Sequence, residues 1–304
     1  MRWKRAVAAA SMLMAIGPGG FIGHAMAEDE FAKSFSLDAG PAIIEPDLPD
    51  RGPVRKDLDS YGGWTALKGQ ATGYFHVEQL GMRTWFITPE GNAFYMLNMG
   101  WAEKKDADRM KSWGFNSSEP NTGMPYTVEM HLLRVPSQQL PLQIPAGYPP
   151  WLTFPDVFDP AWEVNCREAV QKELAPHAED PLMIGYYLDN EVGLNGWYDA
   201  VTATPKDSPC RKAFVEVART YYGGDTAKLA KDWEKYSVTK FEDLLNVEGP
   251  PPGVSGLTTA WETAVAEKAW KTMSTLSREA APHHLNRWPL RANVATSRHL
   301  PGNL

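Results

Sequence analysis

Short apolar runs alternate with amphipathic stretches from about residue 83 to residue 191, and this alternation constrains the fold more than any other feature. The runs "RTWFIT" and "AFYMLNMG" have the length of strands and are separated by "PEGN", a turn sequence. A helix is predicted over 103–113, because Ala107, Met110 and Trp113 fall on one face. Two further short strands are predicted in "GFNSSEPN" and "YTVEMHLLRV".

The alternation continues in the middle of the chain. Asp159 and Pro160 form an N-cap and N1 pair that predicts the start of a helix, and the strand "LMIGYYLDNE" follows that helix. A long amphipathic helix is predicted over 259–281. Strand, helix and strand at this spacing are typical of a parallel βα architecture, so the predicted fold class is α/β.

Polar side chains stand at the predicted strand ends. Asn98 and Trp101 stand at the end of the run "AFYMLNMG", Asn116 in "GFNSSEPN" and His131 in "YTVEMHLLRV", while Asn190 and Glu191 end "LMIGYYLDNE". One polar residue at a strand end is ordinary, but four strands in succession favour a barrel, whose strands carry the active site at their carboxyl ends. The predicted architecture is therefore a (β/α)8-type TIM barrel, with a doubly wound sheet as the main alternative.

The pair Asn190-Glu191 has a chemical reason to stand at such an end. A glycosidic bond is cleaved when one carboxylic acid protonates the leaving oxygen and a second carboxylate acts as nucleophile or base. A Glu at the rim of an apolar strand is partly desolvated, which raises its pKa and keeps its proton near neutral pH. The neighbouring amide can bind a sugar hydroxyl. Two residues alone are a motif of low specificity.

The absence of several sequence motifs argues against other classes of protein. No G-x-G-x-x-G, P-loop, G-x-S-x-G or H-E-x-x-H pattern occurs, so the common nucleotide, esterase and zinc-protease sites are not expected. Cys166 and Cys210 are the only cysteines; they permit a disulfide without requiring one, and they do not suggest a metal site. No cofactor and no metal is predicted.

The first residues have the layout of a secretory signal peptide. Residues 1–27 combine a positive start, an apolar run broken by glycine and proline, and the small-residue cleavage site "AMA". Their removal takes away Arg2, Lys4 and Arg5 and no acid, which moves the formal net charge from -7 to -10. An acidic chain repels phosphate backbones, so no nucleic-acid partner is expected. The protein is predicted to be secreted or periplasmic, with no membrane partner after cleavage, and the sequence leaves its oligomeric state open.

Four blocks of sequence resemble a known family in the order in which that family has them. They are "TWFITPEGNAFYMLNMGW", "WGFNSSEPN", "FPDVFDPAW" and "PLMIGYYLDNE", within about residues 72–285. The family is the agarase-like, clan A glycoside hydrolases, that is, β-agarases related to β-galactosidases of the same barrel clan. The resemblance implies that Glu191 is the general acid/base and Asn190 its substrate-binding neighbour. It also implies an exported enzyme that acts on galactose-containing polysaccharide with retention. Strand alternation points Asp189 away from this pair, which suggests a structural role.

The resemblance also implies more strands than the chain provides. A barrel of eight βα units typically needs about 250 residues. The segment "APHHLN" resembles the family's lead into strand five, but only 22 residues follow Pro282, and the family's nucleophile is a second Glu at the end of strand seven. We therefore expect the first half of a barrel, about four to five βα units, ending in a truncated or frame-shifted product. A divergent terminus on a complete small domain is the alternative. The expected organisation is a signal peptide (1–27), an irregular lead-in (28–60), the N-terminal part of the barrel (61–285) and an atypical tail without acidic residues (286–304).

Three interpretations of the chain fit these observations. The first is a secreted β-agarase-type glycoside hydrolase whose chain lacks the nucleophile half. The second is a non-catalytic carbohydrate-binding remnant that keeps the rings of Trp101, Trp151 and Trp197. The third is an unstable fragment, because half a barrel exposes two sheet edges. In the first, Glu191 is catalytic. Its predicted substrate-binding neighbours are Asn98, Asn116, His131, Asn190 and Trp197. For His131 the alternative is a position in the core. The ring of Trp197 is expected to be exposed in the glycine-rich loop "GLNGW".

Overall fold

The computed structural model describes residues 55–137, 155–190 and 196–287. The chain divides into two units, Met1–Asp50 and Arg51–Leu304, and every element below belongs to the second. The predicted signal peptide, most of the predicted lead-in, Glu191 and nearly all of the predicted tail lie outside the described residues.

A four-stranded antiparallel sheet forms the start of the described chain. Its strand order is β1-β4-β3-β2, and the predicted turn "PEGN" joins β3 to β4. Gly91 in this turn has a φ of 83°, and a Cβ there would press on the backbone of Ala71, so glycine is required. The strands are β1 (Trp64–Lys68), β2 (His76–Leu80), β3 (Arg83–Ile87) and β4 (Asn92–Phe94).

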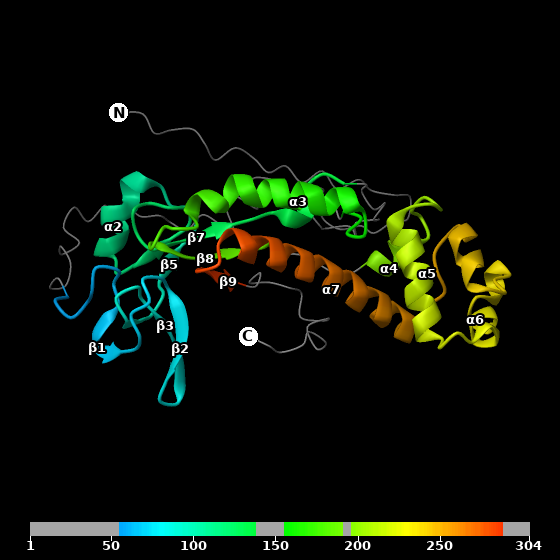
Figure 1. The fold of residues 1–304 in the computed structure, drawn as a ribbon, viewed down its shortest axis with the longest axis horizontal. Helices are drawn as coiled ribbons and strands as arrows, with labels where there is room; N and C mark the ends of the chain where they lie inside the picture. The colour runs from blue at the N-terminus through cyan, green and yellow to red at the C-terminus, as the bar shows by residue number, and fades with distance from the viewer. Residues whose placement is uncertain (1–54, 138–154, 191–195, 288–304) are drawn as a thin grey trace, which may run out of the picture. The chain divides into compact units, whose positions relative to one another are not determined.

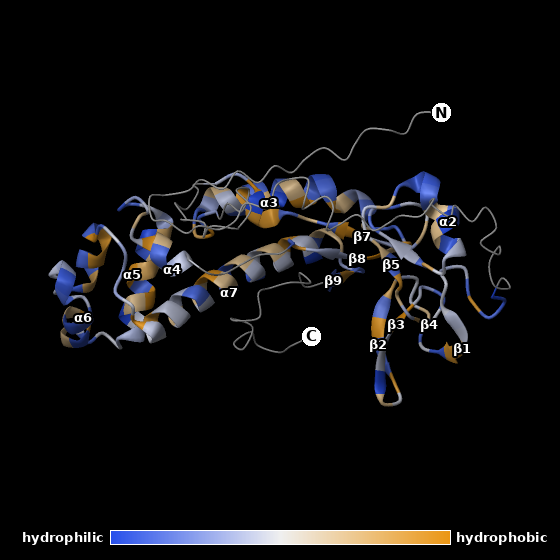
Figure 2. Ribbon diagram, turned by 180° about the vertical axis from the view of Figure 1, so that it is seen from behind, coloured by the Kyte–Doolittle hydropathy of each residue, from blue (hydrophilic) through white to orange (hydrophobic). Residues whose placement is uncertain are grey.

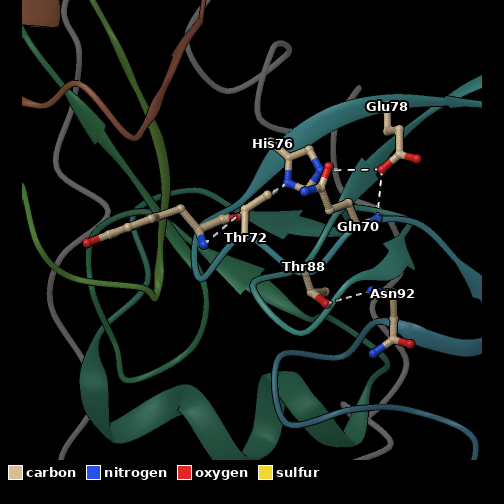
Figure 3. Close-up of polar contacts among 7 residues, drawn as sticks. Gln70, Thr72, His76, Glu78, Thr88 and Asn92 are labelled. Atoms are coloured by element: carbon tan, nitrogen blue, oxygen red, sulfur yellow. Dashed lines mark hydrogen bonds and ion pairs between the residues drawn. The ribbon is translucent and has the colours of Figure 1, made fainter.

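Polar groups in and beside this sheet satisfy one another locally. The carboxylate of Asp59 accepts hydrogen bonds from the Thr88 hydroxyl at 2.5 Å and from the Asn92 amide at 2.6 Å. The Asn92 backbone N–H donates to the Thr88 hydroxyl at 3.1 Å, and the Gln70 backbone N–H donates to Glu78 at 2.9 Å (Figure 3). These contacts stabilise the turn and the strand edges, so we assign these residues a structural role.

A five-stranded parallel sheet follows, and its spatial order is the order of the chain. Every neighbouring pair is parallel, so the described strands lack the reversal of order that defines a doubly wound sheet. The described part of the chain forms no closed barrel. The strands are β5 (Asn98–Met99), β6 (Ser117–Ser118), β7 (Tyr126–Glu129), β8 (Met183–Tyr187) and β9 (Leu285–Arg287).

Helices connect three of the strand pairs. The predicted helix start is confirmed, since the Asp159 carboxylate accepts from the Ala161 N–H at 2.9 Å and Pro160 is the first helical residue. The connections are η1 (Lys104–Asp106) with α2 (Ala107–Ser112) before β6, η2 (Leu132–Arg134) with α3 (Pro160–Glu173) and η3 (Ala175–His177) before β8, and α7 (Ser255–Ala280) before β9.

The helices α3 and α7 lie side by side against the parallel sheet (Figure 1). Tyr126 of β7 and Tyr186 of β8 pack into the same apolar core as Trp162 of α3 and Trp270 of α7. Hydrophilic and hydrophobic residues stand next to each other along α3 and α5, as expected of helices that bury one face (Figure 2). This core covers one face of the sheet.

A helical insertion that the sequence did not predict lies between β8 and α7. It packs on α7 and extends the same core (Figure 1). Its centre is Arg211, whose guanidinium donates to the carbonyl oxygens of Thr202, Thr204, Leu244 and Val247. The insertion contains α4 (Trp197–Val201), α5 (Pro209–Tyr221), α6 (Thr226–Asp232), η4 (Glu234–Tyr236) and η5 (Phe241–Asn246).

A second apolar cluster joins the two sheets at the amino ends of β8 and β9. Phe75 and Phe94, from the antiparallel sheet and the loop before β2, pack on Ile184 and Leu285. A Cβ on Gly185 would collide with the Leu285 carbonyl, so only glycine lets β9 approach β8. The amino ends of these strands are therefore covered, which leaves their carboxyl ends for a site.

The replacement Arg211→Met should lower the free energy of unfolding by about 3 kcal/mol or more, because it leaves several buried carbonyl groups without a donor. Arg167→Met is the matched control, since Arg167 forms an exposed pair with Glu279 and its replacement should cost less than about 1 kcal/mol. Urea denaturation measures both. Equal losses in the two variants would show that Arg211 does not hold the insertion together.

Candidate active site

Five polar residues meet at the carboxyl ends of β7 and β8. Glu129 is the last residue of β7 and pairs in register with Tyr187, the last residue of β8. His131 and Arg134 follow β7, and Asp189 and Asn190 follow β8. Because the two strands are parallel neighbours, these residues stand at one edge of the sheet.

Asp189 holds the two loops together. Its side chain is only 1% exposed. One carboxylate oxygen accepts from the Leu133 N–H at 2.8 Å, and the other accepts from the Asn190 N–H at 2.8 Å. The second oxygen also lies 3.9 Å from Nδ1 of His131 and 3.9 Å from Nε of Arg134. These contacts agree with the structural role expected of Asp189.

His131 lies between two carboxylates. Its Nε2 is 3.7 Å from Glu129 Oε1, while its Nδ1 faces Asp189. Asp189 chiefly, with a smaller contribution from Glu129, raises the pKa of His131 above its usual value of 6.5, against the opposing effects of burial and of Arg134. The side chain is 44% exposed, so the alternative of a core histidine is wrong.

Asn190 and Asn98 are the other predicted site residues with accessible or unsatisfied polar groups. Asn190 is half-buried, and Glu191 directly after it lies outside the described residues, so the role of Glu191 stays a prediction. Asn98 opens β5 in register with Ser117 of β6. Its Oδ1 and the Ser117 hydroxyl are buried without a hydrogen-bond partner in the described part of the chain. Because the two residues are in register, these unsatisfied polar atoms come from neighbouring positions of the sheet.

The expected position of Asn116 at a carboxyl strand end is wrong. The strand β6 contains only Ser117–Ser118, so Asn116 precedes it and lies at its amino end. The side-chain oxygen of Asn116 accepts from the Leu97 N–H at 2.8 Å, and its amide donates to the Tyr95 carbonyl at 2.9 Å. The amide is thus used to hold the segment that leads into β5.

The expected exposed ring of Trp197 is also wrong. Trp197 is the first residue of α4, and its side chain is 1% exposed in the core of the insertion. The Trp261 indole donates to the Trp197 carbonyl at 3.0 Å, which ties α7 to α4. Gly196, with a φ of 93°, ends the glycine-rich loop and starts a helix, so the tryptophan turns inward.

One residue of this site, Arg134, was missed from the sequence, whereas Glu129 was expected, with Glu119, only as an alternative nucleophile. Glu129 and Arg134 lie in the predicted strand "YTVEMHLLRV", where Glu129 and His131 alternate with apolar neighbours. That alternation puts both side chains on one face of the strand, and it was a usable signal. Arg134 follows in a 3-10 turn, η2, which the sequence did not indicate.

The described residues contain no group of three or more His, Cys, Asp or Glu side chains that could hold a metal ion. Cys166 and Cys210 are both buried and unpaired, which answers the question that the sequence left open. Within the described ranges, no helix is long and apolar enough to cross a membrane.

Comparison with known proteins finds likeness in structure alone. No protein-family model and no curated protein matches the sequence. Among solved structures, an agarase named AgWH50C aligns with 78% of this chain and 48% of its own, at a TM-score of 0.63 and 16% identity. PfGH50B aligns with 89% of this chain and 52% of its own, at a TM-score of 0.63 and 17% identity. An exo-β-agarase aligns with 90% of this chain and 53% of its own, at a TM-score of 0.65 and 15% identity.

The chain has the fold of these agarases over the aligned part. The resemblance inferred from the four sequence blocks is thereby confirmed at the level of the fold. The chain spans about half the length of the solved chains that it matches.

The pKa of His131 should lie above 6.5 and should fall when Asp189 is replaced by Asn, because the main cause of the shift is removed. A raised pKa favours the folded state at pH values below the unfolded pKa, and this contribution is lost as the pH rises through the folded pKa. Because the side chain is half-exposed, it should amount to less than about 1 kcal/mol. Titration of the His131 ring signals by NMR measures the value, and a pKa at or below 6.5 would contradict the arrangement.

Proposed function

We propose that the protein is a glycoside hydrolase of β-agarase type that acts on galactose-containing polysaccharide. The observation that carries this proposal is the position of Asn190. It stands at the carboxyl end of β8, the fourth strand of a sheet whose strands follow the chain order, in a fold shared with solved agarases. Glu191 comes next in the sequence, and we propose it as the proton donor.

The proposed roles follow from the chemistry of each group. Glu191 is the general acid/base, and the amide of Asn190 binds a sugar hydroxyl beside the scissile bond. His131, charged at moderately acid pH, donates to a second hydroxyl, with Glu129 and Asp189 fixing its orientation. Asp189 does not react, because backbone N–H groups occupy both of its oxygens.

The proposed mechanism is retaining, which requires a nucleophilic carboxylate about 5 Å from the acid. We propose that the five parallel strands are the first part of a (β/α)8 barrel and that the nucleophile belongs to a strand beyond them. Glu129 is the alternative nucleophile, because it ends β7 beside β8 and is partly exposed. The enzyme is exported by its predicted signal peptide and meets its polymeric substrate outside the cytoplasm.

Residues 28–304 should release little or no reducing sugar from agarose. General acid catalysis alone supplies about 10²–10⁴-fold, which is small beside the 10⁶-fold or more typical of enzymes. A chain extended by strands six to eight of the barrel should be active. Robust hydrolysis by residues 28–304, abolished by Glu129→Gln, would instead make Glu129 the nucleophile.

In the active, extended chain, Glu191→Gln should lower kcat/KM on agarose by at least about 10²-fold, because the leaving oxygen loses its proton donor. The loss in kcat/KM should be far smaller on 2,4-dinitrophenyl β-galactoside, whose leaving group needs no proton in the first step. Glu173→Gln, an exposed carboxylate at the end of α3, is the matched control and should change neither rate. Equal effects of Glu191→Gln on both substrates would rule out the acid role.

A further inference from the structure

Trp101 stands in a backbone conformation that large side chains avoid. Its φ is 53°, and among the described non-glycine residues only Ser237 shares this left-handed region. Ser237 ends the helix η4, where a left-handed residue is common. Trp101 follows β5 and ends no helix, so the usual reason does not apply to it.

The neighbouring backbone imposes this conformation. The Met99 carbonyl, before Trp101, accepts from the Glu119 N–H at 2.9 Å. The Ala102 N–H, after Trp101, donates to the Glu119 carbonyl at 2.9 Å. Both sides of Trp101 are thus attached to the residue that follows β6. The backbone of Trp101 is therefore held at the carboxyl edge of the sheet, which is also the edge where Asn190 lies.

Burial does not compensate the strain at Trp101. The side chain is 91% exposed, whereas Trp162, Trp233 and Trp261 are fully buried. A strained residue that persists without any gain in packing is typical of functional sites. A large exposed aromatic ring at such a position is suited to binding.

We propose that Trp101 is a stacking platform for one galactose ring of the substrate chain, at a subsite away from the scissile bond. The axial 4-hydroxyl of galactopyranose leaves the C3, C4 and C5 hydrogens together on one face, and an indole ring can cover that face. β5 and β8 are three strand spacings apart, or about 14 Å at roughly 4.8 Å each, which exceeds the length of a single sugar ring. Trp101 therefore contacts a different sugar unit from the one beside Asn190. This inference rests on the proposed function.

Trp113 provides a matched control for this proposal. It is also exposed, at 59%, but it caps the end of α2, which leads to the amino end of β6. Arg109 covers its ring, with the guanidinium carbon 5.9 Å from the ring centroid. Trp113 is thus an exposed tryptophan at the opposite end of the sheet.

The test is the affinity for neoagarotetraose, measured by isothermal titration calorimetry with the full chain carrying Glu191→Gln, so that the sugar is not consumed. Adding Trp101→Gly should raise Kd about tenfold, equivalent to about 1.4 kcal/mol. Trp101→Phe, which keeps a ring, should raise Kd less than Trp101→Gly does. Trp113→Ala should leave Kd unchanged.

Thermal melts separate binding from stability. Glycine takes a positive φ without steric cost, so Trp101→Gly should melt at or above the temperature of the parent chain. An unchanged Kd in Trp101→Gly, beside a parent that binds, would overturn the platform and leave the proposed function intact. A parent that does not bind the tetrasaccharide would contradict the proposed substrate, and the platform with it.

Discussion

The buried carboxylate of Asp189 is the contact on which the candidate site depends. It accepts backbone N–H groups from the loop after β7 and from the loop after β8, and it faces His131 and Arg134. A buried carboxylate is tolerated only when its oxygens are hydrogen-bonded. These hydrogen bonds therefore fix the position of the loop after β7 relative to the loop after β8. Through that relation the side chain of His131 and the backbone of Asn190 share one edge of the sheet.

The two ends of the parallel sheet differ in what covers them. At the amino ends of β8 and β9, the antiparallel sheet and the loop before β2 pack Phe75 and Phe94 on Ile184 and Leu285. The helices α3 and α7 and the insertion cover one face with a continuous apolar core. What is left for chemistry is the carboxyl edge, where polar and aromatic side chains gather.

Much of this could be predicted from the sequence, because some signals are local. Asp159 and Pro160 predicted the start of α3, and the turn "PEGN" predicted the hairpin of β3 and β4, since a cap and a turn depend on neighbouring residues. The long helix over 259–281 was found as α7, and "APHHLN" does lead into a fifth strand.

The errors arose where tertiary contacts decide. The strand β6 is only two residues long, so a small shift moved Asn116 from one end of the sheet to the other. Tryptophan and glycine fit an exposed loop as well as a helix start, and only the packing of the insertion buries Trp197. The strain at Trp101 depends on hydrogen bonds to Glu119, which no sequence pattern reveals.

The central claim is that sugar binds at the carboxyl ends of the parallel strands. The most direct measurement is a crystal structure of the chain, carrying Glu191→Gln, with neoagarotetraose bound. We expect a sugar across the ends of β7 and β8, with the Asn190 amide and the His131 ring within hydrogen-bond distance of its hydroxyls. A sugar bound instead to the antiparallel sheet, or to the helices of the insertion, would contradict it.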